Sequence, residues 1–413
     1  MIKKTITSVC LFLILATPVL SRERFFQVQS IDTMKYSRDL AREKLNDFKF
    51  DQTIETQIKN IAGTGATHVS LGTPYEQEFV PYLKRWVAMA RKYKLKVWFR
   101  GNLAGWENWF DYPTIDKVTR IKKISEFIIN NQDLFEDGDV FTSCPECENG
   151  GLGDPRKTGD VEGFRKFIIN EYETVKGAFR GLDKKVTANY YSMNGDVAKL
   201  IMDESTTKKL DGAVTIDHYV KTTKRLEKDI LNYAKDSKGK IVLGEFGAPI
   251  PDIHGDLSQE EQAKWIDDAL RKIVKTQEVI AINYWTSNAS STELWNDDNS
   301  PRLAAATVEN YYNPVNVVGK IKDEKGNPVK EVTIKGREKT IIVTDGTYAI
   351  PVLEKESLTF SKYGYVSVNI GVKAENVKNI TKDIVMVKSY PPTLYSIYMR
   401  IVDFLKGLAG RFK

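Results

Sequence analysis

Two glutamates in this sequence stand at the ends of apolar runs that are typical of buried strands. Glu146 follows the run DVFTSC at residues 139–144, and Glu245 lies near the end of the run KIVLGEF at residues 240–246. Burial opposes the charged form, so an acid at the end of an apolar strand is costly unless it is paired or hydrated. Two carboxyl groups that face one pocket can perform acid–base and nucleophilic chemistry on the acetal bond between sugars.

Such chemistry needs the two carboxyl groups in different protonation states. One must stay protonated until it donates to a leaving oxygen, so burial and the second carboxylate must raise its pKa. The second must stay ionised and attack the anomeric carbon from the opposite face, at a separation of about 5 Å. We expect a hydrogen bond from Tyr219 and the charge of Arg100 to stabilise the attacking carboxylate.

Eight short runs of β-branched or aromatic residues must position these acids, and each is followed by a longer, charged, helical stretch. The runs cover residues 24–31, 67–72, 96–102, 139–144, 185–191, 213–219, 240–246 and 280–286. Regular helices between strands imply parallel crossovers. Eight such units predict a closed (β/α)8 TIM barrel over residues 22–312. An open doubly wound sheet is the alternative, but the segment SIDTMKYSRD after the first run lacks a glycine-rich phosphate turn.

A barrel of this kind carries its active site at the C-terminal ends of its strands, which gives a short set of further candidates. The candidates for substrate binding are Arg100, Asn102, Trp106, Asn189, Tyr191, His218, Tyr219 and Trp285. Flat aromatic rings stack on the faces of sugars, so aromatic residues on several loops favour a groove for a chain of sugars. Core packing is the alternative for Trp285, and a purely structural role is the alternative for His218.

The barrel resembles the clan A glycoside hydrolases, which pair an acid/base after the fourth strand with a nucleophile after the seventh. The resemblance rests on Cys-Pro-Glu after the fourth run, LGEFGAP at the seventh, Asp-His-Tyr at the sixth and Tyr-Trp at the eighth. It implies a retaining mechanism with Glu146 as acid/base and Glu245 as nucleophile. His218 and Tyr219 match the pair on the sixth strand of that clan, and Trp285 matches its sugar platform.

The residue before the proposed acid departs from the clan pattern. Many clan A families place an asparagine there to hold the sugar's 2-hydroxyl, whereas this sequence has Pro145. This departure keeps Glu148, which precedes Asn149 in the same loop, as an alternative for the acid.

The composition changes after Tyr312. Residues 313–389 alternate with period two and carry turn signals every 8 to 12 residues, which predicts a small all-β sandwich. The stretches GKIKDEKGNPVKEVTI, TDGTYAIPV and KYGYVSVNI resemble the carboxypeptidase regulatory-like (transthyretin-like) sandwich family. That resemblance implies an accessory domain without catalysis.

Both ends of the chain carry apolar segments. Residues 1–21 combine a basic start, MIKK, with an apolar stretch, which predicts a signal peptide or an uncleaved N-terminal anchor. Residues 390–413 are predicted to form an amphipathic helix that contacts a membrane surface or packs on a domain. We therefore expect the body of the protein to be secreted or associated with the cell envelope.

Composition and motifs exclude several other classes. The net charge of +6 is mild and not gathered in a basic stripe, so nucleic acid is not an expected partner. His-Glu-x-x-His, P-loop and Gly-x-Ser-x-Gly motifs are absent from the sequence, and we expect neither metal nor other cofactor. In an oxidising compartment Cys144 and Cys147 can form a local disulfide or pack as thiols, and either stiffens the loop around Glu146.

The sequence thus favours an exported retaining glycoside hydrolase that acts on a β-linked oligo- or polysaccharide. A non-catalytic carbohydrate-binding barrel shares the aromatic residues but needs neither acid. A cell-surface adhesin, in which the β-sandwich and the terminal helix carry the function, is a further alternative.

Overall fold

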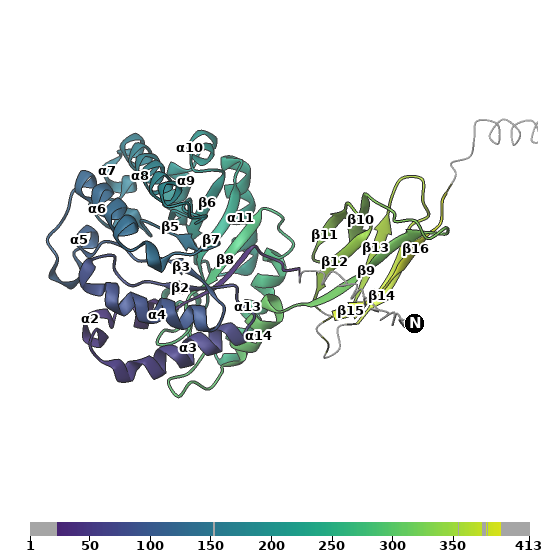
Figure 1. Ribbon diagram of the computed structural model, residues 1–413, viewed down its shortest axis with the longest axis horizontal. Helices are drawn as coiled ribbons and strands as arrows, with labels where there is room; N and C mark the ends of the chain where they lie inside the picture. Colours follow the sequence, from purple (N-terminus) through teal and green to yellow (C-terminus); the bar gives the residue numbers. More distant parts are fainter. Residues whose placement is uncertain (1–22, 152, 354, 374–376, 378, 390–413) are drawn as a thin grey trace, which may run out of the picture.

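The computed structural model describes residues 23–151, 153–353, 355–373, 377 and 379–389. They form a barrel of strands and helices, followed by a smaller β unit (Figure 1). The predictions made for residues 1–21 and 390–413 fall outside the described residues. Within the described part of the chain, no helix combines the length and apolar character needed to span a membrane.

The barrel contains eight parallel strands in one sheet. They are β1 (Val28–Asp32), β2 (His68–Leu71), β3 (Lys96–Phe99), β4 (Val140–Phe141), β5 (Ser192–Asn194), β6 (Ala213–Asp217), β7 (Lys240–Phe246) and β8 (Val279–Tyr284). The sheet order β4-β3-β2-β1-β8-β7-β6-β5 leaves β4 and β5 at its two ends. A parallel bridge between Val140 and Thr187, in the segment that leads to β5, closes the ring. The predicted α/β barrel is confirmed.

Helices surround the sheet and bury their apolar sides against it (Figure 1). They are α1 (Met34–Ser37), α2 (Ala41–Lys44), α3 (Asp51–Gly63), α4 (Val80–Lys92), α5 (Ala104–Glu107), α6 (Lys117–Asn130), α7 (Pro155–Thr158), α8 (Val161–Gly181), α9 (Gly195–Ile201), α10 (Glu204–Lys209), α11 (Thr223–Ser237), α12 (Pro251–His254), α13 (Gln259–Ile273) and α14 (Leu303–Tyr312). Short 3₁₀ turns lie at Phe48–Phe50, Gln77–Phe79, Trp109–Asp111, Gln132–Leu134 and Cys147–Asn149. Helix α13 begins with a capping box between Ser258 and Glu261.

The interior of the barrel is apolar at one end and polar at the other. A compact apolar cluster fills one end, and its buried members are Val28, Trp98, Val140, Tyr190, Ala213, Val242 and Ala281. Side chains alternate along a strand, so residues two positions further along point inward again, nearer to the C-terminal ends. On β1 and β3 these inward positions are occupied by Ser30, Asp32 and Arg100, all buried. The chain therefore places charged groups in the mouth of the barrel.

The fifth strand lies further along the chain than predicted. The prediction was residues 185–191, but pairing with β6 begins at Ser192, and Thr187 only bridges to β4. Tyr190 belongs to the apolar interior cluster. Ser192, two residues further on, also points inward and accepts a hydrogen bond from Arg100 in the polar mouth. Because side chains alternate along an extended chain, Asn189 and Tyr191 point away from the interior.

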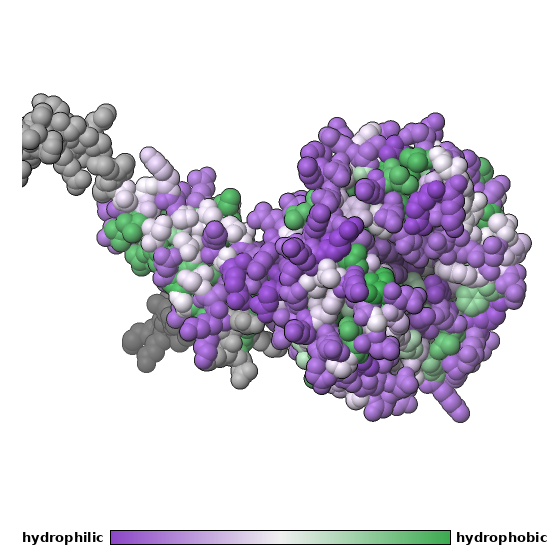
Figure 2. Space-filling model, turned by 180° about the vertical axis from the view of Figure 1, so that it is seen from behind, coloured by the Kyte–Doolittle hydropathy of each residue, from purple (hydrophilic) through white to green (hydrophobic). Residues whose placement is uncertain are grey.

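The smaller unit is built from two sheets around its own core, and this confirms an all-β domain after the barrel. Its strands are β9 (Val315–Asp323), β10 (Val332–Lys335), β11 (Thr340–Val343), β12 (Thr347–Val352), β13 (Glu356–Ser361), β14 (Val368–Val372), β15 (Asn379–Thr381) and β16 (Ile384–Met386). One sheet has the order β11-β10-β13-β14, and the other is built on β9, with β15 and β16 parallel to it. Val317, Ile334 and Phe360 lie in the core between them. The surface seen in Figure 2 is largely hydrophilic, with scattered hydrophobic residues.

Candidate active site

A bulge in β7 presents Glu245 at the mouth of the barrel. The register between β6 and β7 shifts there, so that Asp217 lies opposite Glu245. The residue left unpaired in the bulge is Gly244, where a Cβ atom would lie 2.4 Å from Oδ1 of Asp217. Glycine is therefore the residue that allows β7 to approach β6 so closely at this point.

Each carboxylate oxygen of Glu245 accepts a hydrogen bond from a different donor. Nη1 of Arg100 lies 3.1 Å from Oε1, and the Tyr219 hydroxyl donates to Oε2 at 2.9 Å. The side chain of Glu245 remains 12% exposed. The two donors fix the orientation of the carboxylate, and the remaining exposure leaves it reachable from the mouth.

Arg100 is the centre of a charged network inside the barrel. Its fully buried guanidinium bonds Asp32 at 3.2 Å and Asp217 at 3.0 Å, as well as Glu245. Burial lowers the pKa of Arg100, but the surrounding carboxylates outweigh burial and raise it above its ordinary value. Burial raises the pKa of Asp217 well above its ordinary range, although Arg100 opposes that change. One cation thus bonds three carboxylates, those of Asp32, Asp217 and Glu245.

Glu146 enters the mouth from the loop after β4. Its backbone adopts a left-handed conformation with φ 44°, and its N–H donates to the Ser192 carbonyl at 2.8 Å. Asn194 and Asn149 donate to its two carboxyl oxygens at 3.3 and 3.2 Å. Burial, then the charges of Glu245 and Glu148, raise the pKa of Glu146 to about 8. At neutral pH this carboxyl group is therefore largely protonated.

The loop that carries Glu146 is held from beneath. Cys144 and Cys147 form a disulfide that closes a ring around Pro145 and Glu146. The indole of Trp106 lies under the loop and donates to the Cys147 carbonyl at 3.2 Å. Gly150 and Gly151 pack on that indole, because a Cβ at either would lie within 2.4 Å of its ring atoms.

Glu148, the alternative acid, lies deeper than Glu146. Its side chain is buried, and one of its oxygens accepts from the backbone N–H of Asn194 at 2.7 Å and from the Asn194 amide at 3.1 Å. Burial raises the pKa of Glu148. Asn194 therefore links the two acids of this loop, since its amide also donates to Glu146.

Two predicted sugar contacts lie beneath the mouth, and those predictions are wrong. Trp106 is fully buried, stacked on Phe167 at 5.4 Å between ring centres and with Arg120 at 4.7 Å from its ring. Asn102 is also fully buried, where it accepts from Arg120 at 2.6 Å and donates to Glu107. Both side chains support the loops around the mouth, and neither has a face open to substrate.

The predictions for Asn189 and Tyr191 are wrong for a different reason. Both precede β5 and point away from the barrel interior. The Asn189 amide donates to the Leu210 carbonyl at 3.0 Å, just before β6 begins and so at the opposite end of the barrel from the mouth. Tyr191 is buried against the surrounding helices and accepts a hydrogen bond from Ser143 at 2.9 Å.

The remaining candidates lie at or beside the mouth. Tyr219 and Trp285 meet edge to face at 6.2 Å, and Nζ of Lys35 lies 5.8 Å from the centre of the Trp285 ring. Trp285 is partly exposed. His218 lies one residue from Tyr219 on the outer side, with its ring 3.1 Å from Asp229, and burial lowers its pKa.

The mouth also contains polar residues that were not among the predicted site residues. Asp32 accepts from Ser70 at 2.8 Å and from Asn283 at 3.1 Å, and Asn194 connects the two acids of the β4 loop. The first run ended at Ile31 in the prediction, one residue short of Asp32. The available signal was the inward alternation of Ser30 and Asp32 on β1.

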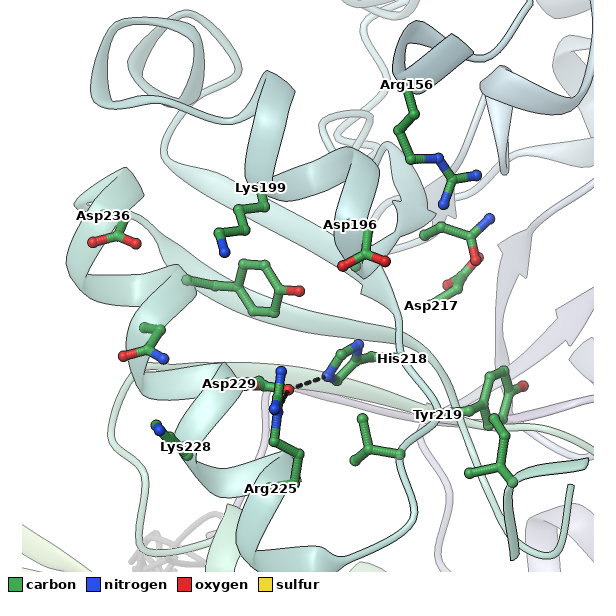
Figure 3. A pocket seen from close by; sticks show the side chains of 16 residues that line it. Arg156, Asp196, Lys199, Asp217, His218, Tyr219, Arg225, Lys228, Asp229 and Asp236 are labelled. Carbon is green, nitrogen blue, oxygen red and sulfur yellow. Dashed lines mark hydrogen bonds and ion pairs between the residues drawn. The ribbon is translucent and has the colours of Figure 1, made fainter.

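A cavity of about 500 Å³ opens beside this site (Figure 3). It borders Asn194, Asp217 and Tyr219, and these residues contact or neighbour the two proposed catalytic acids. Across the described ranges, no group of three or more His, Cys, Asp or Glu side chains has a metal-binding arrangement.

Comparison with known proteins identifies the fold. No family model and no curated protein matches this sequence. A GH5_18 protein from Bifidobacterium longum subsp. longum matches 73% of this chain and 85% of its own, at 16% identity and a TM-score of 0.54. A variant in complex with Manb1-4GlcNAc matches with 14% identity, a TM-score of 0.52 and coverage of 73% and 84%.

A larger protein also matches, at a lower TM-score. Bacteroides uniformis beta-glucuronidase 2 matches 81% of this chain at 12% identity, with a TM-score of 0.46. This chain spans 44% of the length of that protein. At these identities the two GH5_18 matches show a shared fold and nothing finer.

Proposed function

We propose that this chain is an exported glycoside hydrolase that cleaves β-glycosidic bonds in an oligo- or polysaccharide by double displacement. One observation carries the proposal. Glu245, with a donor on each oxygen, shares the mouth with Glu146, whose pKa its charge helps to raise to about 8. The barrel shared with GH5_18 proteins, one of them in complex with Manb1-4GlcNAc, supports a sugar substrate.

In the first step the glycosidic bond breaks between the two acids. A carboxylate oxygen of Glu245 attacks the anomeric carbon, while the protonated Glu146 gives its proton to the departing oxygen. The leaving sugar departs as an alcohol, and Glu245 becomes a glycosyl ester. Arg100 and Tyr219 hold the attacking group in place before the reaction, so little rearrangement is needed.

In the second step water releases the glycosyl group. Esterification removes the negative charge of Glu245, which is one of the causes of the raised pKa of Glu146. The pKa of Glu146 consequently falls after the first step, and its carboxylate can accept a proton from the attacking water. The ester bond breaks, Glu245 returns to its ionised form, and Glu146 is protonated again.

Hydrolysis of aryl β-glycosides by single variants tests the proposal. We expect Glu146→Gln to lose about 10²- to 10⁴-fold in kcat on substrates with poor leaving groups, the usual range for an acid–base residue. We expect Glu245→Gln to lose at least as much with every leaving group, and azide to restore turnover in alanine variants of either acid. Full activity of Glu245→Gln would end the proposal.

Glu148→Gln separates the two candidate acids. If Glu146 is the acid, this variant keeps acid-dependent hydrolysis within about tenfold of wild type, because only the support that Asn194 gives is disturbed. A larger loss in Glu148→Gln than in Glu146→Gln assigns the acid to Glu148. A non-catalytic barrel or an adhesin would bind glycans without releasing product, equally well in all three variants.

Export and the accessory parts belong to the same proposal. A disulfide in the loop of the proposed acid suits an oxidising compartment. We propose that the β unit is an accessory domain of the carboxypeptidase regulatory-like kind and that residues 390–413 contact a membrane surface. Fractionation of cells that express the full chain or a chain ending at residue 389 tests this. Recovery of both chains in the cytoplasm contradicts export, and identical membrane association of both contradicts the role of the tail.

A further inference from the structure

A groove beside the two proposed catalytic acids has no part in the steps described above. It runs from the mouth of the barrel past the end of β6, between α9 and α11 (Figure 3). Its volume is about 500 Å³, and ligand pockets span about 300–1,000 Å³. The residues that line the groove include Asn194, Asp196, Lys199, His218, Lys228 and Tyr233.

The groove begins on the side of the acid. Asn194 lines the groove and donates from its amide to Glu146 at 3.3 Å. Tyr219 also lines it and donates to Glu245 at 2.9 Å, so the groove meets the cleavage point. The acid in a double displacement bonds the oxygen of the leaving group. A saccharide that extends from that oxygen past Asn194 enters the groove.

The floor of the groove is narrow and polar. Gly195 begins α9 against the ring of His218, and a Cβ there would lie 2.5 Å from Nδ1 and 2.6 Å from the Tyr233 hydroxyl. Nε2 of His218 is 3.1 Å from Asp229, which leaves Nδ1 on the groove side. Glycine at 195 thus allows the start of α9 to pack closely against these two polar atoms, and both of their residues line the groove.

The charges of the walls balance. Asp229 pairs with Arg225 at 2.6 Å as well as with His218. Asp196 and Lys199 on α9, and Lys228 and Asp236 on α11, line the groove, and within the described residues these four side chains make no ion pair. They supply two anions and two cations. Hydroxyl groups both donate and accept, so this mixture suits an uncharged sugar and opposes an anionic one.

We propose that this groove binds the leaving-group side of the substrate, as an uncharged saccharide held by Lys199, Lys228 and Tyr233. The inference rests on the proposed function and adds to it a substrate that extends beyond the cleaved bond. By microscopic reversibility the same groove binds sugar acceptors of the glycosyl group. An acceptor hydroxyl then bonds the anomeric carbon, its proton passes to Glu146, and the ester bond to Glu245 breaks.

Reactivation of a trapped glycosyl-enzyme tests the groove separately from the first step. The full chain is labelled with activated 2-deoxy-2-fluoro-β-glycosides of glucose, mannose, galactose and xylose. Recovery of activity is then followed in buffer alone and with cellobiose, mannobiose or chitobiose. The variants are Lys199→Ala with Lys228→Ala, and Tyr233→Phe. The control is Lys166→Ala, an exposed lysine on α8 that lies outside the groove.

We expect at least one disaccharide to accelerate recovery with saturation. Loss of hydrogen bonds from charged groups should raise the half-saturating concentration about tenfold or more in the double variant. Recovery in water should be unchanged in every variant, and Lys166→Ala should match wild type. Acceleration that is absent, or equal in groove variants and wild type, overturns the inference while the proposed function stands. Failure of every reagent to label the protein contradicts the proposed function and this inference together.

Discussion

Nη1 of Arg100 and Oε1 of Glu245 lie 3.1 Å apart at the mouth of the barrel, and the guanidinium that makes this contact is completely buried. The same group bonds Asp32 and Asp217, which come from two further strands. Arg100 therefore joins β1, β3, β6 and β7 around the proposed nucleophile. The same side chain therefore stabilises the barrel and balances negative charge at the proposed active site.

Replacement of Arg100 by glutamine should be strongly destabilising. Removal of one partner from a buried ion network costs about 3–5 kcal/mol, because the remaining charges lack compensation. Chemical denaturation of the purified variant, or its soluble yield if it does not fold, measures the effect. Lys122→Ala is the matched control, since its pair with Glu126 is exposed and removal should cost less than about 1 kcal/mol. Similar unfolding free energies for both variants would contradict the network.

Replacement of Glu146 by glutamine should stabilise the protein more as the pH rises. The pKa of Glu146 is raised from 4.5 to about 8, so the folded protein holds this proton more tightly than the unfolded chain does. The contribution is complete below about pH 4.5 and is lost as the pH rises through about 8. Glutamine stays neutral and avoids that loss. The difference in Tm between variant and wild type should grow between pH 5 and pH 8.5, by about 1–2 °C for each kcal/mol of stability that the wild type loses.

The exposed Glu324 in the β unit provides the control for this measurement. Glu324→Gln should give the same small difference in Tm at both pH values. A difference for Glu146→Gln that is independent of pH would show that burial does not keep this carboxyl group protonated.

The activity of the wild type should decline on the alkaline side with the titration of Glu146. Only the protonated form can donate to a leaving oxygen, so kcat/KM for glycosides with poor leaving groups should fall above about pH 8. Dinitrophenyl glycosides need no proton, and their alkaline limb should be weaker. An identical alkaline limb for both classes of substrate would argue against Glu146 as the acid.

Removal of the disulfide should impair both acid catalysis and stability. The bond between Cys144 and Cys147 closes a ring of only four residues, for which chain entropy gives about 2 kcal/mol. In Cys144→Ser with Cys147→Ser, displacement of Glu146 should lower kcat about 10- to 100-fold for poor leaving groups. Hydrolysis of dinitrophenyl glycosides should change much less. Equal losses of kcat on both classes of substrate would show that the disulfide does not act by positioning Glu146.

Trp106 should behave as a packing residue. Its indole is fully buried beneath the acid loop, so Trp106→Ala should cost about 3–5 kcal/mol of unfolding free energy. Trp106→Phe should fold and show a reduced kcat with little change in KM. Trp109 lies in the same segment after β3 as Trp106 but is partly exposed, so it is the control. Its alanine variant should be nearly as stable as wild type. An increase in KM alone for Trp106→Phe would restore it as a sugar contact.

The barrel could be predicted because most of its strands are short apolar runs followed by amphipathic helices. The two proposed acids could be found because carboxylates at the ends of such runs are costly without a function. The contacts of Glu245 with Arg100 and Tyr219 also follow from the strand ends, since all three lie on the same rim.

The direction of individual side chains was harder to predict. A start of β5 at Ser192 reverses the faces assigned around it, so Asn189 and Tyr191 point away from the interior. Trp106 follows the third strand as a platform would, but the two glycines of another loop lie on its ring. Such contacts join segments that are distant in the sequence, and periodicity carries no signal for them.

The central claim is that Glu245 bonds the anomeric carbon while Glu146 moves the proton. Peptide mapping after labelling with an activated 2-deoxy-2-fluoro-β-glycoside tests it most directly. The account predicts a single glycosyl adduct on Glu245 and none in Glu245→Gln. An adduct on Glu146, Glu148 or Asp217, or turnover of natural substrate with inversion at the anomeric carbon, would contradict it.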